Sequence, residues 1–311
     1  MGPLPGVAEV EPDLTLHRPW IAKDPVEFIA AHGSHIQGIA TSSATEIGAE
    51  LLERLPRLEI IACFGVGYDR IDLDTVRRRG IVLTNAGSIL TEEVADLALG
   101  LLLATLRRIP QADRFVRAGH WRQGGFPLSP SLRGRRVGII GLGKIGRALA
   151  RRLEASQVPV AYHDRRLQPD SALPFFPGLC GLAEAVDTLI LTAPGGEETR
   201  HMVDKAVLDA LGPSGVVVNI ARGSLIDEAA LCAALDENRI LGAGLDVLAE
   251  EPHVPESLRR HENVVILPHV GSATHDTRNA MGRHMIANLR SWFAGTGALT
   301  PVPLIAGEPA R

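Results

Sequence analysis

The stretch VGIIGLGKIGRALARRLEA, residues 137–155, decides the fold of this chain. It opens with a run of Val and Ile, which predicts a buried strand, and it ends in a helical pattern. Between them stand Gly141, Gly143 and Gly146. In such a turn the first glycine permits a tight bend, the second a close approach of phosphate to backbone, and the third close packing of helix on strand.

The turn predicts a dinucleotide with its phosphates at the helix N-terminus, where free N–H groups and the helix dipole favour anions. The alternative is a glycine-rich turn without a ligand. The strand before it, the helix after it and an acid at the end of the next strand favour the cofactor. The expected contacts are Gly141, Leu142, Gly143, Lys144, Ile145 and Gly146.

That acid is Asp164, about 20 residues beyond the turn. An acid here typically bonds the ribose 2′-hydroxyl and selects NAD. However, Arg165 and Arg166 follow at once, and paired guanidinium groups can hold the 2′-phosphate of NADP. The arginines can also be exposed loop charges. The sequence therefore predicts NAD(P), with the choice between NAD and NADP open.

Strands and helices alternate on both sides of the turn. Apolar runs without strict alternation predict strands that are covered on both faces, and the helices between them predict a doubly wound parallel sheet. The further strands are expected at residues 158–164, 188–194, 216–222, 243–247 and 264–269, with helices at 146–155, 204–211 and 228–238.

The first part of the chain has the same α/β character. Strands are expected at residues 36–40, 58–64 and 81–84, and helices at 44–55, 92–108 and 277–294. The length suggests two domains of roughly 100–200 residues each. We expect a discontinuous substrate-binding domain of residues 1–97 and 284–311, and a cofactor domain of residues 98–283.

Composition narrows the class of protein. The chain has 45% hydrophobic and 22% charged residues and a formal net charge of −4, which argues against nucleic acid as a partner. Its three cysteines form no metal-binding spacing, so no metal site is predicted. No basic segment followed by an apolar run opens the chain, and its longest apolar stretch is about half a membrane span. We expect a cytoplasmic protein without a membrane partner.

Polar residues close the later predicted strands: Arg222, Asp246 and His269. A lone arginine is usually a surface residue, and a lone histidine usually belongs to a core. In open α/β sheets, however, ligands bind at the carboxyl ends of the strands. We therefore expect these three side chains to lie with the glycine turn at one site.

The motifs at residues 141–146, 219–223, 244–247, 251–252 and 268–272 resemble those of the D-isomer-specific 2-hydroxyacid dehydrogenases. The similarity runs from about residue 51 to residue 303. Within the family, residues 64–69, 210–213 and 269–278 are most similar to glyoxylate/hydroxypyruvate and hydroxyphenylpyruvate reductases. The resemblance implies a Rossmann cofactor domain and a flavodoxin-like substrate domain.

The resemblance also implies roles for particular residues. Arg222 would hold the substrate carboxylate and polarise the keto oxygen. His269 would donate a proton to that oxygen, and Glu251 would orient His269 and favour its protonated form. Glu250 is the alternative to Glu251. The further contacts implied are Val66 and Gly67 to the carboxylate, Asp246 to the nicotinamide carboxamide, and Pro194, Ile220, Ala221 and Gly271 to the cofactor.

The implied reaction is NAD(P)H-dependent reduction of glyoxylate or hydroxypyruvate, with a slight preference for NADPH. One alternative is a different substrate: a bulkier 2-ketoacid, or another substrate of the class such as phosphoglycerate or D-lactate. The other alternative is a dinucleotide-sensing protein without turnover. A homodimer is implied, with contacts through residues 97–106 and 118–130. Trp121 or Phe126 would reach the partner's site or pack in the interface. The family's first strand is shortened or missing near residues 1–4.

Overall fold

The computed structural model describes residues 14–304 as two compact units. Unit 1 comprises residues up to Leu90 and from Ala273 onward, and unit 2 comprises Thr91–Ser272. The domain boundaries expected at 97/98 and 283/284 lie inside two helices, each of which belongs to one unit as a whole. The expectation of a shortened first strand falls on residues 1–4, which are outside the described range.

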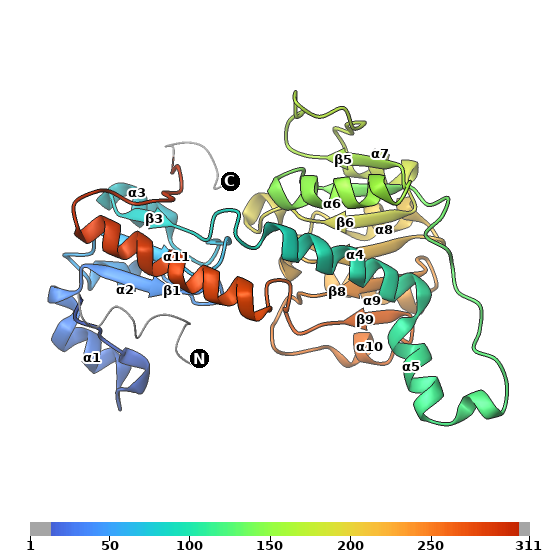
Figure 1. The fold of residues 1–311 in the computed structure, drawn as a ribbon, viewed down its shortest axis with the longest axis horizontal. Helices are drawn as coiled ribbons and strands as arrows, with labels where there is room; N and C mark the ends of the chain where they lie inside the picture. The colour runs from blue at the N-terminus through green and yellow to red at the C-terminus, as the bar shows by residue number, and fades with distance from the viewer. Residues whose placement is uncertain (1–13, 305–311) are drawn as a thin grey trace. The chain divides into compact units, whose positions relative to one another are not determined.

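Unit 1 contains a parallel sheet of order β1-β2-β3. Its core joins the sheet to the helices around it, and helix α11 packs on β1 and β2 (Figure 1). The strands are β1 (Gly38–Thr41), β2 (Ile60–Cys63) and β3 (Val82–Thr84), and the helices are α1 (Pro25–His32), α2 (Ala49–Glu53), α3 (Leu73–Arg79) and α11 (His275–Phe293).

One helix of unit 1 differs from expectation. The predicted helix at 44–55 is shorter at its start, because Ile47 pairs with Ile71 in a parallel bridge and its backbone is committed to that pairing. A cavity of about 1000 Å³ lies beside the outer strand β1, lined mainly by apolar side chains such as Leu16, Trp20 and Phe293.

Unit 2 is built on a six-stranded parallel sheet of order β5-β4-β6-β7-β8-β9. The strands are β4 (Val137–Ile140), β5 (Val160–His163), β6 (Thr188–Leu191), β7 (Val216–Asn219), β8 (Gly242–Leu245) and β9 (Val264–Ile266). The chain order reverses between β4 and β6, so their following loops leave in opposite directions, which is where such sheets bind ligands. The predicted doubly wound parallel sheet is confirmed.

Helices cover both faces of this sheet, and Figure 1 shows α4 and α6 in front of it and α8 and α9 behind it. Helix α4 packs on β7, β8 and β9, where Gly244 leaves room for it: a Cβ there would lie 2.6 Å from Thr105 Oγ1. The helices are α4 (Thr91–Arg107), α5 (Ile109–Arg117), α6 (Lys144–Ala155), α7 (Leu179–Ala185), α8 (Lys205–Leu211), α9 (Glu228–Asp236) and α10 (Glu256–Arg259).

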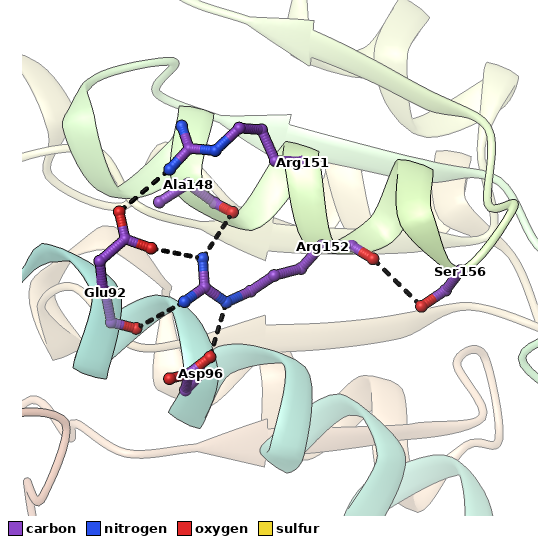
Figure 2. A network of polar contacts seen from close by, with 6 residues as sticks. All are labelled: Glu92, Asp96, Ala148, Arg151, Arg152 and Ser156. Atoms are coloured by element: carbon purple, nitrogen blue, oxygen red, sulfur yellow. Dashed lines mark hydrogen bonds and ion pairs between the residues drawn. The ribbon is translucent and has the colours of Figure 1, made fainter.

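An ion-pair network joins α6 to α4 (Figure 2). The guanidinium of Arg152 contacts Glu92 Oε2 at 2.8 Å and Asp96 Oδ1 at 2.6 Å, and it also donates to the carbonyl of Ala148. Arg151 NH2 lies 3.0 Å from the other oxygen of Glu92. The helix that starts at the glycine turn is therefore fixed laterally as well as by its packing on the sheet.

Candidate active site

The glycine turn joins β4 to α6, and each of its glycines has its own steric reason. Gly141 has a φ of 95°, and a Cβ there would lie 2.7 Å from the backbone of Ala193. At Gly146 a Cβ would lie 2.3 Å from the carbonyl oxygen of Gly141. At Gly143 a Cβ would meet nothing within 4 Å, so the backbone is open at this point. Two glycines thus permit the packing, and the third leaves an approach to the backbone.

That approach leads to unpaired hydrogen-bond donors. Among the described residues, the backbone N–H groups of Gly143, Lys144 and Ile145 have no acceptor. They stand at the N-terminus of a 12-residue helix, where the helix dipole favours negative charge. The residues present therefore fit the pyrophosphate of a dinucleotide. Leu142, also predicted to contact it, is buried and donates its N–H to Asp164 Oδ2 at 3.1 Å.

Asp164 is held by several donors of its own chain. Besides Leu142, the N–H of Arg165 donates to Oδ1 at 2.8 Å and Gln168 Nε2 donates to Oδ2 at 3.3 Å. Arg165 and Arg166 are exposed, and Arg165 NH1 lies 3.2 Å from Glu198 Oε2. The acid thus braces the glycine turn, a role that the sequence did not indicate.

Arg222 lies in a turn beyond β7, not on the strand, which ends at Asn219. Asn219 is fully buried; its Nδ2 donates to the carbonyl of Arg222 at 2.8 Å and its Oδ1 accepts the N–H of Ala221 at 3.0 Å. These two bonds close the turn. Ile220 is buried within it, and the guanidinium of Arg222 donates to the carbonyl of Ala221 at 2.7 Å.

Asp246 anchors the loop that carries His269. Its carboxylate accepts the N–H groups of Val270 at 2.8 Å and of Gly271 at 2.9 Å, and its carbonyl accepts the N–H of His269 at 2.8 Å. Burial raises the pKa of Asp246, and the two backbone N–H groups offset part of that rise. His269 has a φ of 54°, a conformation rare for residues other than glycine. The buried carboxylate therefore holds an unfavourable backbone in place.

His269 and Glu251 form a pair: Nδ1 of the histidine lies 2.8 Å from Oε2 of the glutamate. The other oxygen, Oε1, accepts the N–H of Leu248 at 3.2 Å. Among the described residues the Glu250 carboxylate has no such partner. Between the two acids, the structure thus places Glu251 on the histidine.

The charge on Glu251 is stabilised by its surroundings. Burial alone would raise the pKa of Glu251, but the hydrogen bond and positive charge of His269 outweigh burial, with help from the Leu248 N–H and the Arg222 guanidinium. The pKa of Glu251 consequently lies below its ordinary value, and the residue is a carboxylate at neutral pH. Arg222, Glu251 and His269 are therefore electrostatically coupled within unit 2.

Val66 and Gly67 belong to unit 1, in the loop after β2. Asn85 Nδ2 donates to the carbonyl of Val66 at 3.0 Å, which fixes the loop. In the described part of the chain, the N–H groups of Val66 and Gly67 have no acceptor. This loop therefore offers two adjacent donors, as an anion site requires.

The other predicted cofactor residues lie at the same edge of the unit 2 sheet. Pro194 is exposed after β6, and its carbonyl accepts Thr199 Oγ1 at 2.9 Å. A Cβ at Gly271 would lie 3.2 Å from Asp246 Oδ2.

In the described range, no group of three or more His, Cys, Asp or Glu side chains is arranged for a metal ion. No helix there is long and apolar enough to cross a membrane.

Sequence reasoning missed the residues that support this site. Asn219 was quoted only as part of a motif, and Gln168, Glu198 and Asn85 received no role. Asn219 had a usable signal, since an asparagine that ends a buried strand competes for backbone hydrogen bonds in turns. Glu198 had none, because its partner Arg165 is 33 residues away.

Comparisons with known proteins agree with this geometry. Residues 99–271 match the family model of the D-isomer specific 2-hydroxyacid dehydrogenase, NAD binding domain. The chain is 47% identical to glyoxylate/hydroxypyruvate reductase A HPR2 of Arabidopsis thaliana and 44% identical to hydroxyphenylpyruvate reductase of Plectranthus scutellarioides, with 94% of each chain covered in both cases.

A solved structure is similar over nearly the whole chain. It is the NADPH-dependent glyoxylate/hydroxypyruvate reductase of Sinorhizobium meliloti in complex with NADP and malonate. The two sequences are 50% identical, the TM-score is 0.86, and the match covers 92% of this chain and 88% of the other. The chain therefore belongs to the D-isomer-specific 2-hydroxyacid dehydrogenase family, as these similarities, the glycine turn and the histidine–glutamate pair together indicate.

Proposed function

We propose that this protein reduces a small 2-ketoacid of the glyoxylate/hydroxypyruvate type to the D-2-hydroxyacid with NAD(P)H. The observation that carries the proposal is the His269–Glu251 pair at 2.8 Å, electrostatically coupled to Arg222 in the unit that holds the glycine turn. A proton donor, a cation for an anionic substrate and a dinucleotide site are the parts that this reduction requires. The named activities of the similar reductases support the same substrate class.

Arg222 is proposed to bind the substrate carboxylate and to polarise the keto oxygen. A guanidinium presents several N–H donors in one plane, which suits a planar carboxylate, and it stays charged at all working pH values. The turn closed by Asn219 fixes the backbone from which this side chain extends. We propose the N–H groups of Val66 and Gly67 as further donors to the carboxylate, on the ground that both lack an acceptor within the described residues.

His269 is proposed as the acid. With Nδ1 on Glu251, the other ring nitrogen, Nε2, carries the proton toward the keto oxygen as its charge develops. The carboxylate of Glu251 stabilises the protonated ring and fixes its orientation. Asp246 holds the His269 loop through three hydrogen bonds, so the donor keeps its position while its proton leaves.

The cofactor supplies the hydride when bound. The N–H groups at the start of α6 would hold its pyrophosphate, and residues 164–166 would face its adenosine ribose. The remaining proposed contacts are those at the carboxyl ends of β6–β9: Pro194, Ile220, Ala221, Asp246 and Gly271. NADPH is the proposed preference, supported by the NADP-bound relative and by Arg165 and Arg166.

The test is turnover by three purified variants with glyoxylate and hydroxypyruvate. Arg222→Ala and His269→Ala should each lower kcat/KM by about 100-fold or more, as expected for loss of a charged substrate contact or a general acid. His253→Ala is the matched control, because this exposed histidine lies near Glu251 but outside the proposed machinery. Near-full activity in either of the first two variants would refute the roles.

We also propose that two copies of the chain associate. Helix α5 and residues 118–130 project from the rest of unit 2 (Figure 1) and expose large apolar side chains, among them Trp121 at 67% and Leu128 at 100%. Such a patch is typical of an interface. Light scattering should give twice the mass of the chain, and Leu128→Asp should lower it. Leu299→Asp, at a similarly apolar exposed site, should not. A monomeric wild type would refute this.

Cys63, Cys180 and Cys232 are not joined in disulfides, which fits the reducing cytoplasm that we propose as the location of the protein.

A further inference from the structure

The loops after β5 and β6 are joined by one ion pair. Arg165, after β5, places NH1 3.2 Å from Oε2 of Glu198, in the turn η5 (Glu197–Thr199) after β6. Strand β4 lies between β5 and β6 in the sheet. The ion pair therefore spans the end of β4, on the side where the glycine turn begins and where the ribose of a dinucleotide follows its pyrophosphate.

Asp164 is a poor candidate for choosing between NAD and NADP on its own. Its carboxylate already accepts from the N–H groups of Leu142 and Arg165 and from Gln168 Nε2. These bonds brace the turn whichever cofactor is present. At this edge the Arg165 guanidinium, which is 47% exposed, is paired with Glu198, which is 59% exposed, so a bound ligand can exchange that partner. Arg166 is exposed as well.

We propose that Glu198 is a determinant of cofactor specificity: it pairs with Arg165 in competition with the 2′-phosphate of NADP. This rests on the proposed ribose site at residues 164–166. With Glu198 in place, a 2′-phosphate must displace one carboxylate and tolerate its negative charge nearby. The 2′-hydroxyl of NAD meets neither cost. Glu198 thus narrows the preference for NADP that Arg165 and Arg166 create.

The magnitude follows from the exposure of the pair. An ion pair this exposed changes an equilibrium by no more than about fivefold, and removal of the nearby negative charge adds a smaller factor in water. Glu198→Gln should therefore strengthen binding of a 2′-phosphorylated ligand by about 5–10-fold and leave a ligand without that phosphate unchanged within about twofold.

The experiment measures binding of two cofactor fragments by titration calorimetry, so that it does not depend on turnover. Adenosine 2′,5′-bisphosphate carries the 2′-phosphate and 5′-AMP lacks it. The variants are Glu198→Gln, Arg165→Gln and the double variant. Glu197→Gln is the matched control, since this neighbouring exposed carboxylate makes no side-chain hydrogen bond or ion pair within the described residues. Steady-state KM for NADPH and NADH is measured alongside.

The proposal expects a gain in bisphosphate affinity with Glu198→Gln that disappears in the Arg165→Gln background and shrinks in about 0.5 M salt. An equal gain with Glu197→Gln, or no gain with Glu198→Gln, overturns it. If Arg165→Gln weakens the bisphosphate while Glu198→Gln has no effect, the ribose site stands and only this inference fails. If Arg165→Gln leaves both fragments unchanged, the ribose site itself is misplaced.

Discussion

Replacing Asn219 by alanine should weaken both the stability of unit 2 and its activity. The side chain is fully buried, and it bonds the N–H of Ala221 at 3.0 Å and the carbonyl of Arg222 at 2.8 Å. Alanine removes both partners at once and leaves a small cavity at the end of β7. The turn that carries Arg222 is then held only by its backbone.

The size of the effect follows from these two bonds. Each buried polar group left without a partner costs about 1–3 kcal/mol. The carbonyl of Arg222 still accepts the N–H of Leu225 at 3.2 Å, and Ala221 is only half-buried, so water can replace part of what is lost there. We therefore expect the free energy of unfolding to fall by about 2–4 kcal/mol. For a unit of this size, that corresponds to a decrease in Tm of roughly 4–16 °C.

The loss of activity should exceed the loss of folded protein. A displacement of about 1 Å at a positioning residue can cost about 100-fold in rate. We expect kcat/KM for glyoxylate to fall by about that factor at a temperature where the variant is folded. The assay is thermal unfolding by circular dichroism together with steady-state kinetics on the same preparation.

Asn263→Ala is the control. Asn263 also bonds a backbone carbonyl, that of Leu241 at 2.7 Å, but it stands before β9 at the opposite edge of the sheet. It should lower Tm and leave kcat/KM unchanged. If Asn219→Ala kept the wild-type kcat/KM, or if both variants lost activity equally, the assignment of Asn219 to the Arg222 turn would be wrong.

Three further predictions address other parts of unit 2. Gly143→Ala should leave Tm unchanged, because the added Cβ meets no atom within 4 Å. It should weaken NADPH binding by about 10–100-fold, because the methyl group keeps the cofactor phosphate from its charge-assisted hydrogen bond to the backbone. Gly146→Ala should lower Tm, because its Cβ would lie 2.3 Å from Gly141 O; equal melting temperatures in the two variants would contradict this. Glu251→Gln should reduce stability at neutral pH but not in acid. Because folding lowers the pKa of Glu251, its ionised carboxylate stabilises the protein at pH values above its ordinary pKa of 4.5, and this stabilisation is lost as the pH falls through the lower folded pKa. Denaturant titrations check this: a difference in unfolding free energy between wild type and variant that did not narrow between about pH 6 and pH 3 would count against it. Arg135→Met should lower the free energy of unfolding by about 2–4 kcal/mol without changing kcat/KM. The carbonyl of Ser214 loses this donor, and Asp187, 2.9 Å from Arg135, loses its charged partner and keeps only the N–H of Arg136 and the hydroxyl of Thr188. Urea unfolding with unchanged stability would disprove this one.

Several features could be predicted from the sequence because they depend on local chemistry. The glycine spacing at 141–146 is specific because two of its positions exclude a Cβ outright. The strands at 137–140, 188–191 and 216–219 were predictable because strands buried on both faces read as continuous apolar runs. Arg222, Asp246 and His269 could be assigned to one edge because parallel strands bring their carboxyl ends together.

Other features required the tertiary structure, because they join residues distant in sequence. Asp164 carries a motif for ribose binding, yet its Oδ2 accepts from Leu142 and Gln168 and its Oδ1 accepts the N–H of Arg165. The resemblance favoured Glu251 over Glu250 as the partner of His269, and the structure supplies the contact itself, at 2.8 Å.

The first group of features depends on interactions between residues close in sequence, and the second depends on contacts between polar groups far apart in sequence. Hydrophobic period and glycine sterics act within a few residues, so the sequence by itself determined the parallel sheet, its glycine turn and the family. The partners of Arg165 and Asp246 depend on which strands become neighbours. A one-dimensional pattern does not encode those distances, and only the folded chain decided them.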